Sequence, residues 1–372
     1  MFRISMQFLV LCAIAIGLPV AAKAAPKVVV SIKPLHSIVS AVMQGVGKPE
    51  LIVSGNASPH DFALKPSQAK LLQDADLIFW VGHELELFLE KPLKTIAADA
   101  TAIELMDAEG LVKFEVRDLI EVTRKEHDHE EEHAEHEHEE DHDEHKHEEK
   151  HAEHEHEEGH DDHKHEEKHA EHDHEEGHDD HKHEDEHVEH KSEHEHGHAH
   201  EGDDPHIWLD PQNAEVIAGV VADALAKADS QNAELYRKNS SNFIMKLDEL
   251  KLKVGTQLEG VNDKPYLVMH DAFQYFERRF GLMPTGSIMI HSEQSPGAGR
   301  ISKLKKIVQA TNLKCVFTEP QLNSKPVKAI AEGAGVEINS IDPLGADLEN
   351  GPELYPALIR NIAASFTKCL SH

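Results

Sequence analysis

Cysteine, aromatic side chains and long apolar runs are all scarce in this sequence. The 372 residues include 3 cysteines, and aromatic residues make up 5% of the chain. The main apolar run, from Phe8 to Val20, is too short to be a good membrane span. It follows the basic Arg3 and leads into residues 22–24 (AKA), which is the pattern of a secretory signal peptide. We therefore expect residues 1–24 to be removed on export and the mature chain not to insert into a membrane.

The small number of cysteines limits the disulfides that the mature chain can form. Cys12 lies inside the apolar run, so Cys315 and Cys369 are the only cysteines left after export. Two thiols in an exported chain favour a disulfide, which would stabilise the fold by roughly 4 kcal/mol on the chain-entropy model. Two buried free thiols are the alternative.

Arginine and large apolar side chains are missing from residues 126–201. This segment has 35 Asp and Glu, 6 Lys and no Arg, and Val188 is its only apolar residue larger than alanine. It carries −29 of the net charge of −33, which leaves −4 for the rest of the chain. The charge therefore gives no reason to expect nucleic-acid binding. Without apolar side chains to offset the entropy of ordering, we expect this insert to be disordered in the absence of metal.

Histidine is abundant in the same insert. It holds 26 of the 33 histidines, in an 18-residue repeat that covers 129–146, 147–164, 165–182 and, in degenerate form, 183–200. Imidazoles interleaved with carboxylates predict many overlapping zinc sites of modest affinity, so we expect a zinc reservoir that loses its metal below about pH 6.5, where imidazole protonates. A solvated spacer and a helical form (18 residues make five turns) remain open.

Short apolar runs alternate with helix-like segments on both sides of the insert. Continuous apolar strands separated by helices indicate parallel sheets that are covered on both faces. Apolar residues from Leu235 to Leu258 also form one stripe, which predicts a long helix over about 231–259. The predicted fold class is α/β, with two lobes, each a parallel sheet flanked by helices, joined by one long rigid helix. The apolar runs are 27–32, 50–54 and 76–82 before the insert, and 265–270, 285–290, 314–319 and 336–342 after it.

These patterns also predict where the domains begin and end. The expected parts are a signal peptide (1–24), an N-terminal α/β lobe (25–125), the histidine-rich insert (126–201), a return to the N-terminal lobe (202–228), the linking helix (229–262) and a C-terminal α/β lobe (263–372).

Three polar residues stand where ligands bind in open α/β sheets, at the carboxyl ends of the strands, and a fourth candidate lies elsewhere. His270 and Asp342 each end an apolar run, and His60 lies in the loop after the second run. His206 stands where the chain returns from the insert. Three imidazoles and one carboxylate converging from both lobes would form a tetrahedral, nitrogen-rich site, which suits zinc.

Several motifs around these residues resemble one protein family. They are "ASPHDFALKPSQAKLLQDADLIFWVG", "DPHIWLDP", "VMHDAFQYFERRFGL", "FTEPQ" and "IDPLG", with the histidine-rich insert just before the second. Together they resemble the periplasmic metal-binding proteins of ABC-type importers, specifically their zinc-binding, ZnuA-like branch. The resemblance covers essentially the whole mature chain.

The resemblance implies a metal held between two lobes by His60, His206 and His270. Asp342 or water would take the fourth position. Manganese-binding relatives have a carboxylate where His270 stands, so this histidine favours zinc. The implied function is high-affinity Zn²⁺ capture in the periplasm and delivery to the membrane subunit of an ABC permease. We expect a monomeric binding protein and not an enzyme.

Other functions and other histidines must also be considered. A periplasmic zinc buffer or metallochaperone, a zinc hydrolase, and a manganese or nickel carrier of the same fold are the alternatives to the importer function. His36 and His291 are expected to be local hydrogen-bonding or exposed residues. His83 is expected to be a loop histidine, with an accessory role near the cleft as the alternative.

Overall fold

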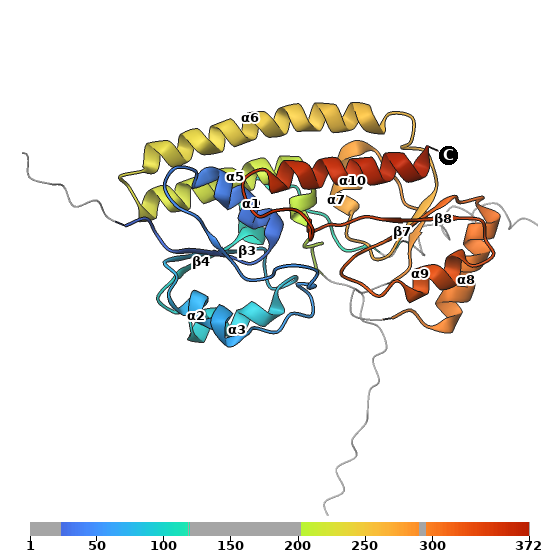
Figure 1. Cartoon of the computed structure of the whole chain (residues 1–372), viewed down its shortest axis with the longest axis horizontal. Helices are drawn as coiled ribbons and strands as arrows, with labels where there is room; N and C mark the ends of the chain where they lie inside the picture. The colour runs from blue at the N-terminus through green and yellow to red at the C-terminus, as the bar shows by residue number, and fades with distance from the viewer. Residues whose placement is uncertain (1–23, 118, 120–201, 290–294, 372) are drawn as a thin grey trace, which may run out of the picture. The chain divides into compact units, whose positions relative to one another are not determined.

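Two parallel sheets form the centre of the fold (Figure 1). The computed structural model describes residues 24–117, 119, 202–289 and 295–371; the predicted insert and residues 1–23 of the predicted signal peptide lie outside these ranges. The described residues belong to one compact unit, whose halves we call the N-terminal and C-terminal lobes. Their architecture confirms the predicted α/β fold class.

The sheet of the N-terminal lobe has the strand order β2-β1-β3-β4, and all its neighbours are parallel. β1 and β3 are apolar and buried along their whole length, which is expected of central strands with helices on both faces. Figure 1 shows α1 and α5 on one face of this sheet and α2 and α3 on the other. The strands are β1 (Val28–Val30), β2 (Glu50–Leu51), β3 (Leu77–Trp80) and β4 (Thr101–Glu104), and the helices are α1 (Lys33–Val42), α2 (Pro66–Gln73), α3 (Leu87–Thr95) and α5 (Pro211–Ala228), with short 3₁₀ helices η1 (Leu105–Asp107) and η2 (Ile207–Leu209).

The sheet of the C-terminal lobe repeats this arrangement, with the order β6-β5-β7-β8 and parallel neighbours. In Figure 1, α7 and α10 lie on one face and α8 and α9 on the other. The strands are β5 (Tyr266–Val268), β6 (Gly286–Ser287), β7 (Cys315–Thr318) and β8 (Glu337–Ser340), and the helices are α7 (Gln274–Phe280), α8 (Ala298–Ala310), α9 (Lys325–Ala331) and α10 (Leu354–Leu370).

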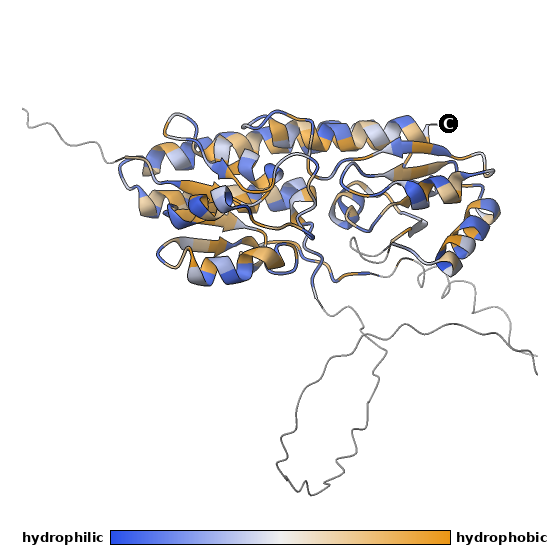
Figure 2. Cartoon of the chain, turned by 60° about the horizontal axis from the view of Figure 1, so that its bottom comes forward, coloured by the Kyte–Doolittle hydropathy of each residue, from blue (hydrophilic) through white to orange (hydrophobic). Residues whose placement is uncertain are grey.

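The predicted long helix is α6 (Ala233–Leu258), which packs against α1 and α5 of one lobe and α7 and α10 of the other. Its buried stripe begins at Tyr236 and not at Leu235, which is about one-third exposed. From Tyr236 the buried positions follow at intervals of three or four residues, which is the helical period. Figure 2 shows the same division of polarity: the strands are apolar, and the helices have one apolar face and one polar face.

A disulfide joins Cys315 on β7 to Cys369 on α10, as the sequence predicted. It ties the third strand of the C-terminal sheet to the helix that covers it, and both cysteines are fully buried. In the described part of the chain, no helix combines the length and the apolar character needed to cross a bilayer.

One strand and one boundary differ from the sequence prediction. The strand β4 was not predicted, because it lies at the edge of its sheet and its side chains are exposed or only half-buried. The helix-like segment that follows the apolar run 76–82 does not begin directly after this run, because α3 begins at Leu87. The four residues before it form a loop at the end of β3.

Candidate metal centre

His60, His206 and His270 converge at one place. Each offers a ring nitrogen, and these ligand atoms all lie within 4.8 Å of one another. The ring centroids are 5.5 Å apart for His60 and His206, 6.1 Å for His60 and His270, and 5.3 Å for His206 and His270. The fourth sequence-predicted residue, Asp342, is not part of this group.

Each histidine is placed by a different element. His60 lies in the loop between β2 and α2, where its backbone N–H donates to the Ser58 hydroxyl at 3.3 Å. His206 directly precedes η2. His270 follows β5 after one residue, at the carboxyl edge of the C-terminal sheet. The site therefore joins one sheet-end residue to two residues held by loops.

A pair of short segments on either side of the insert positions His206. Glu115 and Asp203 form an isolated antiparallel bridge. The N–H of Val116 donates to the carbonyl of Gly202 at 3.1 Å. These contacts fix the chain three residues before His206.

The Asp204 carboxylate orients the His206 ring. Oδ1 of Asp204 accepts a hydrogen bond from the backbone N–H of His206 at 3.0 Å and lies 2.7 Å from the ring Nδ1. Oδ2 accepts from the Gln274 amide at 3.1 Å, and the Tyr275 hydroxyl donates to the Asp204 carbonyl at 2.7 Å. A carboxylate on Nδ1 favours the tautomer that leaves Nε2 free to bind a metal.

The Glu319 carboxylate orients the ring of His270 in the same way. It follows β7, the strand beside β5, and its Oε1 lies 2.7 Å from Nδ1 of His270. Glu319 is 2% exposed and His270 is 8% exposed. Nε2 of His270 is buried and has no hydrogen-bond partner among the described residues. An imidazole nitrogen in this position needs a ligand, since an unsatisfied buried polar atom is costly.

The surroundings shift the pKa values of two of the three histidines in opposite directions. Burial, and then the nearby rings of His206 and His270, lower the pKa of His60 well below its usual value, so it is neutral at neutral pH. Burial also opposes the charged form of His270, but the charge and hydrogen bond of Glu319 outweigh it and raise the pKa of His270. Neutral imidazole is the form that binds metal.

The three rings line a cavity of about 20 Å³, together with Trp208, Glu319 and other residues of both lobes. This is enough for one water molecule or one ion, because a water needs roughly 10–15 Å³ by the same measure. Trp208 closes one side: its ring lies 5.3 Å from that of His206, and its Nε1 donates to the carbonyl of Pro343 at 2.9 Å.

The Asp342 carboxylate organises a loop beside the cavity. Its Oδ1 accepts from the Gln321 amide at 2.8 Å and from the N–H groups of Leu344 and Gly345 at 2.9 and 3.0 Å. Its Oδ2 accepts from the N–H of Ala346 at 2.6 Å. Gln321 and Leu344 both line the cavity, so Asp342 shapes its wall.

Arg117, in the segment before the insert, forms an ion pair with Asp271, the residue that follows His270. Its Nε and a terminal nitrogen each donate to the Asp271 carboxylate at 2.7 Å, and the same terminal nitrogen contacts the buried Glu277. Bidentate pairs of this kind fix geometry as well as charge. The backbone around His270 is therefore held from both lobes.

Sequence reasoning did not single out Asp204, Glu319 or Arg117. Asp204 stands two residues before His206, and Glu319 lies in the quoted motif "FTEPQ", so both were visible in the sequence. Their contact with the histidines depends on the fold. His36 is a buried local residue whose Nε2 lies 3.1 Å from the carbonyl oxygen of Pro49, as expected. His291 lies outside the described residues.

Comparison with known proteins places this chain in a family. A family model described as "Zinc-uptake complex component A periplasmic", named ZnuA, matches residues 28–369. The chain is 45% identical to the "High-affinity zinc uptake system protein ZnuA" of Brucella suis biovar 1 over 344 residues, which is 92% of this chain and 91% of the relative. It is 36% identical to the Haemophilus influenzae protein of the same description, over 92% of this chain and 93% of that one.

Solved structures show the same fold. A structure described as "Crystal structure of ZnuA" aligns with a TM-score of 0.64 at 21% identity, covering 93% of this chain and 99% of the other. A zinc-bound ZnuA with residues 138–173 deleted aligns with a TM-score of 0.65 at 21% identity, over 94% of this chain and 99% of the other. From the family match and the two relatives, the chain belongs to the ZnuA family of periplasmic zinc-uptake components.

Proposed function

We propose that this protein captures Zn²⁺ in the periplasm with His60, His206 and His270 and delivers it to the membrane subunit of an ABC permease. The observation that carries the proposal is the convergence of three ring nitrogens within 4.8 Å beside a cavity of about 20 Å³. Tetrahedral zinc with nitrogens at about 2.0–2.1 Å holds them roughly 3.3 Å apart, so modest ring movements would complete the site.

The donor set favours zinc over manganese. All three members of the group are imidazoles, which suit zinc, whereas manganese prefers carboxylate oxygens. Asp342 uses both of its oxygens on Gln321 and on loop amides. We therefore assign Asp342 to shaping the cavity wall, and water to the fourth position.

The arrangement suits tight binding without catalysis. Zinc hydrolysis requires an open metal position and a carboxylate placed to act as a base. Here Asp204 and Glu319, the buried carboxylates beside the ligands, each hold a histidine ring through Nδ1. The protein thus acts as a carrier and not as an enzyme. All three ligands come from one chain, which supports a monomer.

Release requires the ligands to separate. His270 follows a strand of the C-terminal sheet, whereas His60 follows a strand of the N-terminal sheet. The helix α6 packs against both lobes, which favours small lobe movements over a wide hinge opening. A shift of about 1–2 Å at the permease would already break a bond of about 2 Å and free the ion.

The sequence-predicted insert, residues 126–201, complements this site. We propose that it holds further zinc with lower affinity and that residues 1–24 direct export to the periplasm. The abundance of imidazoles and carboxylates in the insert supports the first proposal. The apolar run from Phe8 to Val20 supports the second.

Zinc titration with a competing chelator tests the capture proposal. The mature protein should bind one ion tightly and several weakly, and a variant that lacks 126–201 should keep only the tight one. Loss of tight binding in a deletion variant that remains folded would show that the transport site lies elsewhere.

Delivery needs a separate measurement. Zinc-loaded protein should bind vesicles that contain the permease and transfer zinc into them on ATP hydrolysis. A protein that binds zinc tightly but neither docks nor transfers would be a periplasmic buffer. Vesicles that contain an unrelated ABC permease provide the control.

A further inference from the structure

A second group of metal-ligating side chains lies where β3 and β4 end, apart from the three-histidine group. It consists of His83, Glu84 and Glu104, whose ligand atoms also lie within 4.8 Å of one another. Nδ1 of His83 is 3.1 Å from Oε1 of Glu104, and Nε2 is 3.3 Å from Oε1 of Glu84. Each nitrogen of one ring therefore faces a different carboxylate.

Gly82 makes the space that this group surrounds. A Cβ atom added at Gly82 would lie 2.9 Å from Oε1 of Glu104 and 2.9 Å from Oε2 of Glu84. The two carboxylates thus converge on the volume that any other side chain would occupy. Gly82 does not have the left-handed conformation that favours glycine, so the requirement for glycine here is one of space.

The charge of the group is poorly balanced. Across the described residues, neither Glu84 nor Glu104 forms an ion pair with a lysine or arginine, and each pairs only with His83. Their side chains are about one-quarter exposed, so their mutual repulsion is only partly screened by solvent. By contrast Glu90, on the helix that follows, pairs with Lys94 at 2.7 Å.

A further carboxylate lies beneath the same loop. Glu86 is fully buried, and its Oε2 accepts hydrogen bonds from the N–H groups of Val81 and Gly82 at 2.9 and 3.0 Å. These two hydrogen bonds hold the backbone that leads to His83. A divalent cation above Gly82 would offset the charges of Glu84 and Glu104.

We propose that His83, Glu84 and Glu104 form a second Zn²⁺ site, open to solvent, with one nitrogen and two oxygen donors and water as the remaining ligands. The ion would replace the proton that now bridges an imidazole nitrogen and a carboxylate, since zinc binds both donor types at about 2.0–2.2 Å. Exposure and the single nitrogen make it weaker than the three-histidine site.

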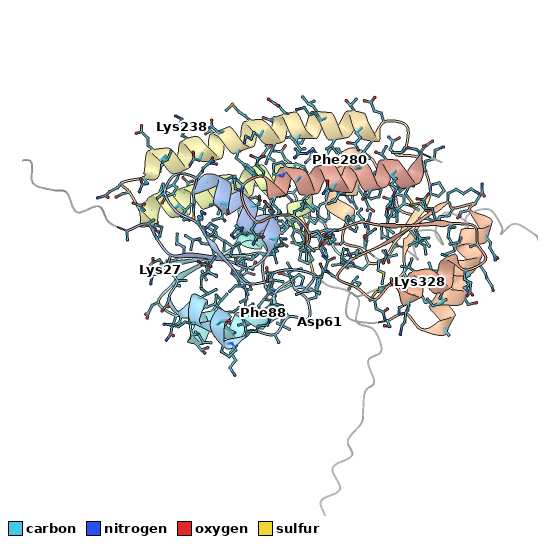
Figure 3. All side chains as sticks on the ribbon, in the orientation of Figure 1. Lys27, Asp61, Phe88, Lys238, Phe280 and Lys328 are labelled. Carbon is cyan, nitrogen blue, oxygen red and sulfur yellow. A yellow bond between two sulfur atoms is a disulfide. The ribbon has the colours of Figure 1, made fainter. Side chains whose placement is uncertain are left out.

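The second site lies on the same side of the N-terminal lobe as the transport site. His83 and Glu84 follow β3 and Glu104 ends β4, whereas His60 follows β2, and parallel strands have their carboxyl ends at one edge. Phe88 at the start of α3 packs on Phe62, with ring centroids 5.0 Å apart. Figure 3 labels Asp61, the neighbour of His60, and Phe88 on the side of the lobe away from α6. The Phe62–Phe88 contact thus links the loop that carries His60 to the start of α3, the helix that follows the loop of His83.

Anomalous diffraction at the zinc edge tests the site in the full mature chain crystallised with excess ZnCl₂. We expect one peak at the three histidines and a second bonded to His83 and at least one of the two glutamates. Gly82→Ala, which places a methyl group between the carboxylates, and His83→Asn should each remove only the second peak. Glu90→Gln, a charge change one helical turn beyond Glu86, should keep both.

A solution titration separates a real site from one occupied only at crystal concentrations. The ring signal of His83 in a ¹H–¹³C NMR spectrum, assigned with His83→Asn, should shift or broaden once the tight site and the insert are saturated. The proposal fails if the peak is absent in wild-type crystals whose three-histidine site is full. It also fails if Gly82→Ala and His83→Asn both retain the peak, or if the ring signal responds only at millimolar free zinc.

Discussion

Each lobe buries a glutamate shortly after the third strand in its sheet order, but the two glutamates have different partners. Glu86 follows β3 and is 0% exposed; Glu319 follows β7 and is 2% exposed. Glu86 accepts hydrogen bonds from the N–H groups of its own loop. Glu319 contacts the ring of His270, which follows the neighbouring strand. Topologically equivalent carboxylates thus support a loop in one lobe and a metal ligand in the other.

The neighbouring strand explains the difference. In the C-terminal sheet, β5 lies beside β7 and is followed by Met269 and His270. In the N-terminal sheet, β1 lies beside β3 and is followed by Ser31 and Ile32, which lead into α1. A buried carboxylate beside an imidazole orients a ligand, whereas the same group beside a backbone turn fixes that turn.

Removing a ligand should have the largest effect. His270→Ala removes one of three nitrogens and should weaken tight zinc binding by more than the 10- to 100-fold typical of losing an outer hydrogen bond. Chelator competition measures the affinity. His36→Ala, which removes a buried histidine outside the group, should leave the affinity unchanged. Equal zinc affinity in both variants would mean that His270 is not a ligand.

Removing the disulfide should destabilise the C-terminal lobe before the N-terminal lobe. Cys315→Ser with Cys369→Ser opens a loop of sequence separation 54 and should lower the free energy of unfolding by about 4 kcal/mol, less if the denatured chain retains structure. Hydrogen exchange should show the loss of protection first in β7 and α10. Protection lost equally in β1 and β3 would show that the lobes unfold as one unit.

The pH dependence of stability should depend on Glu86. Burial, the main cause, raises its pKa from 4.5 to about 7 in the folded chain. The pKa of Glu86 is higher in the folded chain than in the unfolded chain. The free energy of unfolding is therefore not reduced by Glu86 below about pH 4.5, and it falls as the pH rises towards 7. The loss is at most on the order of 3 kcal/mol.

Glu86→Gln removes this titration. Measured by urea unfolding with EDTA present, the variant should lose less stability than wild type between pH 4.5 and 7.5. The difference between the two proteins isolates Glu86 from the other carboxylates. Identical pH profiles would show that Glu86 remains ionised when buried.

The sequence predicts those parts of the molecule that depend on local pattern. Continuous apolar runs identified seven of the eight described strands, and period-3.6 spacing identified α6. The edge strand β4 was missed because its half-exposed side chains lack such a run. Leu235 and Tyr236 are adjacent apolar residues, and only packing against neighbouring helices decides which of them is buried.

The histidine candidates were visible in the sequence, but their supporting residues were not identified. His60, His206 and His270 lie at loop or strand ends, where ligands bind in such folds. The contact between His270 and Glu319 depends on the pairing of β5 with β7, which are far apart in sequence. A carboxylate after a strand can bind metal or hold a turn. Asp342 holds a turn, and the sequence "IDPLG" fits both uses.

The smallest expected effect is a difference in zinc affinity between variants of the two buried glutamates. Glu319→Gln keeps the size of the side chain and an oxygen for Nδ1 of His270 but removes the charge that favours the metal-bound ring. Zinc affinity should fall by about 10- to 100-fold. Glu86→Gln, the matched control in the other lobe, should leave the affinity unchanged, because the hydrogen bonds of Glu86 go to the N–H groups of Val81 and Gly82 and to none of the three histidines. If both variants weakened binding equally, the two carboxylates would act through the stability of the lobes, and Glu319 would have no specific influence on His270.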